Sequence, residues 1–153
     1  MAGAAGCSKN DVMSPPESRS CIDYADYLHL CGGVDTPEPL RGVVVAGSHA
    51  YVAEGSRGLQ VIDVSNPDSP ALAGGVDTPG TALGVAVVGS LACVADGSSG
   101  LQVIDVSNPA SPVILGSAGT AGGASGIAAV GSFAYVAGGS GGLQIVDISN
   151  PAA

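Results

Sequence analysis

Three aspartates, Asp63, Asp105 and Asp147, recur at a constant interval in this chain of 153 residues. Carboxylates that converge in a fold could bind a metal ion or act in general acid–base chemistry. Each aspartate, however, stands two residues before a Ser-Asn-Pro turn, where a carboxylate can accept hydrogen bonds from turn amides. A residue that recurs in every repeat is more typical of a structural role than of a functional site. We therefore assign a structural role to these aspartates and to the asparagines of the three turns, Asn66, Asn108 and Asn150.

Local function is expected where the repeats differ. One loop reads Glu54-Gly55-Ser56-Arg57-Gly58 in the first repeat, and its counterparts begin at Asp96 and at Gly138. These loops would lie on one rim of the fold and form a graded acidic patch. Glu54, Arg57 and Asp96 are therefore candidate binding residues, with ordinary solvated turns as the alternative.

Other constellations that carry chemistry are missing from the sequence. His29 and His49 are not repeated and have no partner at a spacing typical of a nucleophilic triad. No Cys-x-x-Cys pair occurs, and neither histidine sits at zinc-ligand spacing. No lysine follows the glycine clusters, which excludes a phosphate-binding loop of the usual pattern. The sequence therefore predicts no catalytic residue, no cofactor and no metal site.

The four cysteines, Cys7, Cys21, Cys31 and Cys93, allow limited conclusions. A disulfide that joins Cys21 to Cys7 or to Cys31 stays open. Cys93 occupies a position that holds tyrosine in the other two repeats. We therefore expect it to replace a core side chain rather than to act as a nucleophile.

Charge and composition exclude several classes of protein. Thirteen acidic against four basic residues give a formal net charge of −9, which disfavours nucleic acids and anionic membrane surfaces as partners. No apolar run approaches the roughly 18–20 residues of a membrane span. Because 46% of residues are hydrophobic and 11% charged, wholesale disorder is also disfavoured.

An internal repeat determines the expected fold. Its period is 42, because Gly42, Gly84 and Gly126 open the same segment. Residues 42–67 and 84–109 agree at 20 of 26 positions, and 84–109 agree with 126–151 at 17 of 26. Agreement at this level is too high to arise by chance, so the units are true repeats.

Each unit has room for four strands. In the first unit we expect strands over 42–46, 50–53, 59–64 and 71–77. Several of these strands are apolar on both faces, which indicates sheets that are covered on both sides. We predict an all-β fold, a partial β-propeller of about three four-stranded blades, with a β-sandwich as the structural rival.

The recurrent segment Leu-Gln-Val-Ile-Asp-Val-Ser-Asn-Pro resembles the motif of LVIVD-repeat proteins. It is preceded by Tyr-Val-Ala and followed by Val-Asp-Thr-Pro, and the resemblance covers about residues 28–153. The family consists of bacterial and archaeal β-propeller-like proteins, most of them extracytoplasmic, without general catalytic residues. The resemblance therefore implies a propeller-like fold and a secreted or cell-surface location.

Two regions are expected along the chain. Residues 1–20 are interpreted as a disordered tail or the remnant of an export or lipoprotein signal, because Ala4-Ala5-Gly6-Cys7 resembles the end of a lipobox. A secretory signal with basic and apolar regions does not precede Cys7. Residues 21–153 are expected to hold repeat units at 42–83, 84–125 and 126–153, with a strand at 28–36 that completes a blade.

Three blades are too few for a closed ring, since propellers use about 4–8 blades. Two copies could complete a six-bladed ring, the open ends could pair with another partner, or the chain is a truncated fragment of a longer repeat protein. The function that we expect is a non-enzymatic binding or scaffold module, with an unknown protein or carbohydrate ligand. The alternatives are a propeller hydrolase or lyase whose site forms only on assembly, or a fragment without an independent function.

Overall fold

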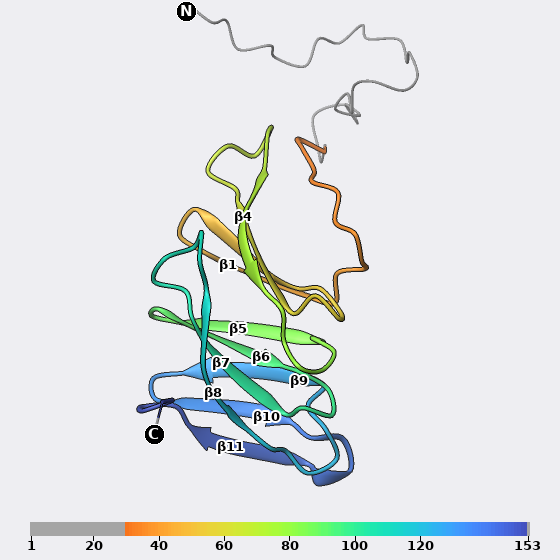
Figure 1. Ribbon diagram of the computed structural model, residues 1–153, viewed down its shortest axis with the longest axis vertical. Helices are drawn as coiled ribbons and strands as arrows, with labels where there is room; N and C mark the ends of the chain where they lie inside the picture. Colours follow the sequence, from red (N-terminus) through yellow and green to blue (C-terminus); the bar gives the residue numbers. More distant parts are fainter. Residues whose placement is uncertain (1–29, 153) are drawn as a thin grey trace, which may run out of the picture.

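In the part of the chain that the structure describes, three antiparallel β-sheets follow one another along the long axis of the molecule (Figure 1). The computed structural model describes residues 30–152. The expected tail at 1–20, Cys7, Cys21 and His29 lie outside this range. None of the described residues forms a helix with the length and apolarity needed to cross a membrane. The prediction of an all-β repeat fold is confirmed.

Each sheet is a meander, in which strands that are consecutive in sequence pair with each other. The first sheet contains β1 (Gly42–Ala46), β2 (His49–Ala53), β3 (Leu59–Asp63) and β4 (Ala71–Val76). The second contains β5 (Gly84–Val88), β6 (Leu91–Ala95), β7 (Leu101–Asp105) and β8 (Val113–Ala118). The third contains β9 (Gly126–Val130), β10 (Phe133–Ala137) and β11 (Leu143–Asp147), with a 3-10 turn, η1 (Gly139–Gly141), before its last strand.

Turn chemistry sets the ends of the strands. The two-residue connection between β1 and β2 begins with Gly47 at φ 61°, a left-handed conformation that tight hairpins require and that glycine adopts without strain. The expected strands at 59–64 and 71–77 each end one residue earlier, and the strand expected at 50–53 begins at His49. Pairing of β3 with β4 shifts register between Val61 and Ile62, which leaves one extra residue in β4.

Two apolar cores join the sheets. Leu59 and Val61 of the first sheet pack with Val85, Val94 and Ile104 of the second. We call the face of a sheet that contacts the next sheet in sequence its forward face, and the opposite one its back face. Successive residues of a strand point to opposite faces, so the second sheet is covered on both sides. Its forward face packs with the back face of the third sheet, through Cys93, Leu101, Val103, Ala134, Val136 and Ile148.

At the two ends of the stack, apolar side chains are exposed, whereas their counterparts in the sheets inside the stack are buried. On the forward face of the third sheet, Leu143 is 69% exposed, whereas its counterpart Leu101 is fully buried. On the back face of the first sheet, Val43 is 65% exposed, against 9% for Val85. We name these surfaces the forward end face (Val130, Phe133, Leu143 and Ile145) and the back end face (Val43, Val45 and Leu72).

The chain enters the first sheet through residues 30–41, which we call the entry segment. The strand predicted over 28–36 is wrong for its described part, because residues 30–36 carry no strand. They also do not complete the third sheet, which has three strands within residues 30–152. Instead Val34 packs on the back face of the first sheet, against Ala50, Val52 and Ile62. No strand of the described chain lies beside the segment to pair with it, which explains the missing ladder.

Three glycines, one in the entry segment and one in the fourth strand of each of the first two sheets, lie against the proline turn that follows the third strand of the next sheet. A Cβ atom on any of them would overlap a proline carbonyl oxygen, so only glycine fits without a shift. The pairs are Gly32 with Pro67, Gly74 with Pro109, and Gly116 with Pro151. Gly74 lies in β4 and Gly116 in β8. The entry segment therefore occupies the place that a fourth strand of a preceding sheet would take.

Candidate functional site

The structure places Glu54 and Asp96, the two acidic rim candidates, inside the protein. They begin the loops that join β2 to β3 and β6 to β7, and they are 1% and 0% exposed. The graded acidic patch expected on the surface is therefore not formed by these side chains. The physical reason is their hydrogen bonding, since a carboxylate remains buried only where donors surround it.

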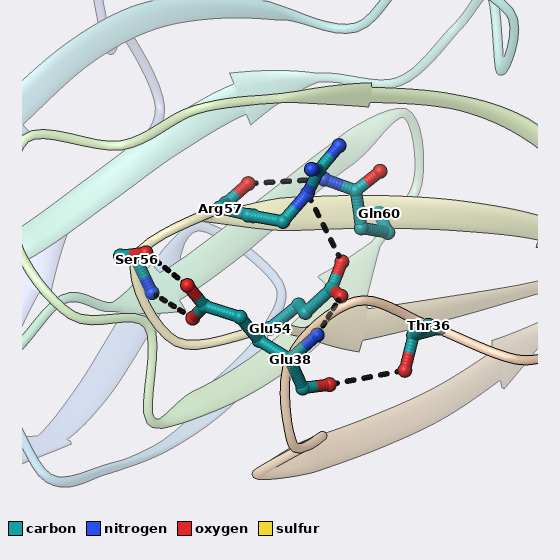
Figure 2. A network of polar contacts seen from close by, with 6 residues as sticks. All are labelled: Thr36, Glu38, Glu54, Ser56, Arg57 and Gln60. Carbon is teal, nitrogen blue, oxygen red and sulfur yellow. Dashed lines mark hydrogen bonds and ion pairs between the residues drawn. The ribbon is translucent and has the colours of Figure 1, made fainter.

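Glu54 holds the entry segment (Figure 2). Its Oε1 accepts a hydrogen bond from the Glu38 N–H at 2.9 Å. Glu38 in turn accepts at Oε1 from the Ser56 hydroxyl, at 2.6 Å, and at Oε2 from the Ser56 N–H, at 3.0 Å. These bonds, the hydroxyl first, hold the pKa of the Glu38 carboxyl below its ordinary value of 4.5. Entry segment and loop are thus tied from both sides.

Arg57 belongs to the same network, and its side chain is exposed. Its Nε lies 3.7 Å from Glu54 Oε2, and its side chain is 47% exposed (Figure 2). The Arg57 carbonyl accepts a hydrogen bond from Gln60 Nε2 at 3.0 Å. Side chains on both sides therefore fix the loop that carries the guanidinium.

Asp96 makes the corresponding contact in the second repeat, with one bond more, because the counterpart Thr36 hydroxyl donates to the Glu38 carbonyl and not to Glu54. Its Oδ1 accepts from the Thr78 hydroxyl at 2.6 Å, and its Oδ2 accepts from the Gly80 N–H at 2.9 Å. Gly80 stands at the repeat position that Glu38 occupies one unit earlier. The carboxylate at position 54 or 96 thus binds the chain that enters its repeat. We call this contact the linker clamp.

The third repeat lacks this carboxylate, because Gly138 stands in its place. Gln144 replaces part of the clamp, with its amide bonded to the Ala121 carbonyl at 3.0 Å and to the Ala121 N–H at 3.3 Å. The Thr120 hydroxyl, counterpart of the Thr78 hydroxyl, is buried without a hydrogen-bond partner. An unsatisfied buried hydroxyl destabilises a fold by about 1–3 kcal/mol, so the third repeat carries a defect that the second does not.

The recurrent aspartates hold turns. In each repeat the carboxylate accepts a hydrogen bond from the N–H of the serine two residues later, at 2.8, 2.8 and 2.9 Å, for Asp63, Asp105 and Asp147. Serine hydrogen bonds also lower the pKa of all three carboxyls below the ordinary 3.8; the Ser65 hydroxyl contributes most for Asp63, and the serine N–H for the other two. Each aspartate lies on a different sheet. Within residues 30–152 no three metal-ligating side chains cluster.

The asparagines act in the same turns. Asn66 Oδ1 accepts from the Asp68 N–H at 3.2 Å, and Asn108 Oδ1 accepts from the Ala110 N–H at 3.3 Å. Asn150 occupies the matching position after β11. These contacts terminate strands, as expected of residues before a proline turn.

His49 and Cys93 are placed apart from the linker clamps. His49 pairs across the strands with Asp63, and its ring lies 6.5 Å from that of Tyr51. Cys93 is fully buried in the core between the second and third sheets, and burial raises the pKa of its thiol to about 11. A thiol with that pKa is a poor nucleophile at neutral pH, so the expectation of a core side chain is confirmed.

Sequence reasoning missed the partners of the buried carboxylates. Glu38, Thr78 and Gln144 were not among the candidates, although the Val-Asp-Thr-Pro repeat that contains Thr78 was visible. A threonine that recurs at one repeat position, facing an acid in the next loop, is the signal that could have identified the clamp. Glutamines at 60 and 102 bond the carbonyl oxygens of their own loops, at Arg57 and Ser99.

Comparison with known proteins gives one result. The family model described as LVIVD repeat matches residues 40–78, 79–120 and 121–153. A search of curated proteins found no match. The three matched segments follow the three sheets, and together they span well over half of the chain. The chain therefore belongs to the LVIVD repeat family, and its fold is a propeller-like repeat module.

Proposed function

We propose that this chain is a non-enzymatic binding or scaffold module that works at a cell surface or after secretion. The observation that carries the proposal is that the acidic side chains of the repeats bind the protein's own backbone. The buried carboxylates of Glu54 and Asp96 hold the incoming chain, and the recurrent aspartates hold turns. Such contacts stabilise a stack of sheets and leave recognition to the loops that differ between repeats.

Arg57 is the residue of these loops best suited to contact a ligand. A guanidinium carries five N–H donors in a rigid plane, and the buried Glu54 carboxylate forms an ion pair with its Nε at 3.7 Å. The corresponding residues are Ser99 and Gly141, so this donor occurs once in three repeats. An anchored planar donor fits a carbonyl or carboxylate group of a protein, or neighbouring hydroxyl groups of a carbohydrate.

The test uses the labelled 153-residue chain on an array of defined oligosaccharides, followed by calorimetry with each sugar that binds. We expect Arg57→Ala to weaken binding at least about tenfold, since a lost charged hydrogen bond is worth about 1.5–3 kcal/mol. Arg41→Ala is the matched control, because Arg41 is an exposed arginine outside the loop, and it should bind like the wild type. Equal binding by Arg57→Ala and wild type would remove Arg57 from the proposal.

The same samples distinguish the enzymatic alternative. Chromogenic esters and glycosides should show no turnover above background with the purified chain. Turnover that Glu54→Gln or Asp96→Asn abolishes, in protein that remains folded by circular dichroism, would support a hydrolase instead. As its partner we propose a second copy of the chain, which would complete a ring of six sheets.

A further inference from the structure

We infer that the entry segment of one copy forms the missing fourth strand of the third sheet of another copy. In this arrangement the back end face of one copy packs on the forward end face of the other. This inference rests on the proposed pairing of two copies and specifies its contact. It makes the third sheet a composite of two chains, with β9, β10 and β11 from one and residues 30–34 from the other.

Three contacts place the entry segment as a fourth strand. Gly32 meets the Pro67 turn of the first sheet as Gly74 of β4 meets the Pro109 turn of the second. Val34 packs on the first sheet, as its counterpart Val76 packs on the core between the first and second sheets.

The third contact is the linker clamp. The Glu38 N–H donates to Glu54 as the Gly80 N–H donates to Asp96. The segment thus meets the following sheet as β4 does, but within residues 30–152 the three strands that accompany β4 have no counterpart on its side.

The other end of the stack offers those three strands. The outer strand β11 pairs only with β10 among the described strands, whereas β3 and β7 pair on both sides. An open strand edge is a template for an added strand. Ile145 of β11 is 60% exposed, while its counterparts Val61 and Val103 are 0% and 4% exposed. The same side chains are therefore covered wherever a fourth strand and a following sheet are present.

The repeat supplies the register of the added strand. In the first sheet Leu59 pairs with Val76, Gln60 with Gly75 and Val61 with Gly74. Moving these pairs by whole repeats predicts Leu143 opposite Val34, Gln144 opposite Gly33 and Ile145 opposite Gly32. Val43 and Val45 would then pack against the third sheet as Val85 and Val87 pack in the core between the first and second sheets.

A head-to-tail contact of this kind must close on itself or continue into a fibre. Known propellers have about 4–8 blades, and six is the only multiple of three in that range. Two copies joined by two equivalent contacts therefore give a closed ring in which every sheet has four strands. We expect light scattering after size-exclusion chromatography to give twice the monomer mass of 14.6 kDa. A monomer at all concentrations up to about 100 μM, well above the roughly micromolar affinity of a weak interface, would overturn the inference.

Complementation of variants tests the orientation. Ile145→Lys damages the forward end face and Val43→Lys the back end face, and each alone should be monomeric because every contact includes one damaged face. A buried unpaired charge is costly, so we expect each dissociation constant to rise at least about 100-fold, which corresponds to about 2.7 kcal/mol. A mixture of the two should recover dimers, since the undamaged faces can still meet. Dimers formed by either variant alone would contradict head-to-tail docking.

Val113→Lys is the matched control, because Val113 is 54% exposed on the second sheet, away from both end faces. It should dimerise like the wild type, and circular dichroism should show that all three variants are folded. Hydrogen exchange then tests strand addition, with β11 and residues 30–34 expected to become protected together as concentration rises. A dimer that protects neither segment would overturn the strand contact. The Arg57 measurements are made separately, so their failure and the failure of assembly are distinguishable.

Discussion

The second and third sheets agree at 17 of 26 positions over the matched segments 84–109 and 126–151, but their surroundings differ. Leu101 is fully buried between two sheets, whereas Leu143 is 69% exposed. The Asp96 carboxylate satisfies the Thr78 hydroxyl, whereas the Thr120 hydroxyl has no partner. The same local sequence therefore gives the same sheet, and burial and polar satisfaction depend on the neighbouring repeat.

The largest difference in stability is expected between alanine variants of Leu101 and Leu143. Leu101→Ala removes a fully buried side chain and should lower the free energy of unfolding by about 2–5 kcal/mol. Leu143→Ala, at protein concentrations low enough to separate copies, should cost less than about 1 kcal/mol. Urea denaturation followed by circular dichroism measures both. Equal losses at low concentration would show that the forward end face is covered within a single chain.

The linker clamp of the second repeat should come next. Asp96→Ala leaves the Thr78 hydroxyl and the Gly80 N–H without their acceptor and should cost about 1–3 kcal/mol. Asp96→Asn retains one acceptor oxygen and should fall between alanine and the wild type. The same urea titrations apply. An alanine variant as stable as the wild type would mean that the clamp contributes nothing to stability.

The two threonines should respond in opposite directions. Thr78→Val removes a donor to a buried carboxylate and should lower stability by about 1.5 kcal/mol, the lower end of the range for a hydrogen bond to a charged group. Thr120→Val removes a hydroxyl that has no partner and should leave stability unchanged or raise it. Thermal unfolding of the pair at one protein concentration makes the comparison. A loss of stability in Thr120→Val would indicate that this hydroxyl has an acceptor in solution.

The smallest effect should be the acid dependence of the turns that all repeats share. Serine hydrogen bonds lower the pKa of Asp63, Asp105 and Asp147 below 3.8 in the folded chain. Their contribution to stability is therefore complete above the unfolded pKa and is lost as the pH falls through the folded value. Asp63→Asn should reduce the difference between urea midpoints measured at pH 5 and at pH 3. An unchanged difference would contradict a stabilising role for the ionised carboxylate.

Periodicity predicted the strands well because each strand is determined locally. Apolar runs such as 59–64 and glycine turns such as Gly47 recur at the same position of every repeat, and the strand bounds followed to within one residue. The aspartates before Ser-Asn-Pro could be assigned for the same reason, since their hydrogen bonds reach only two residues along the chain.

Contacts between distant segments could not be predicted in the same way. Glu54 and Asp96 looked like exposed loop acids, because the donors that bury them lie 16 or 18 residues earlier in sequence. The strand expected over 28–36 failed for a related reason. Its residues match a fourth strand, but a strand also needs a neighbour, and the described chain provides none on that side.

The glycines at 32, 74 and 116 have a consequence for the curvature of the stack. Each brings an outer segment into direct contact with a proline turn of the next sheet, so together they set the angle between successive sheets at the outer edge. A methyl group at one of them would widen that edge and change the angle. Because angles add along a stack, the displacement would be largest at the far end of the molecule. Closure of the ring that we propose for two copies therefore depends on the absence of a side chain at these three positions.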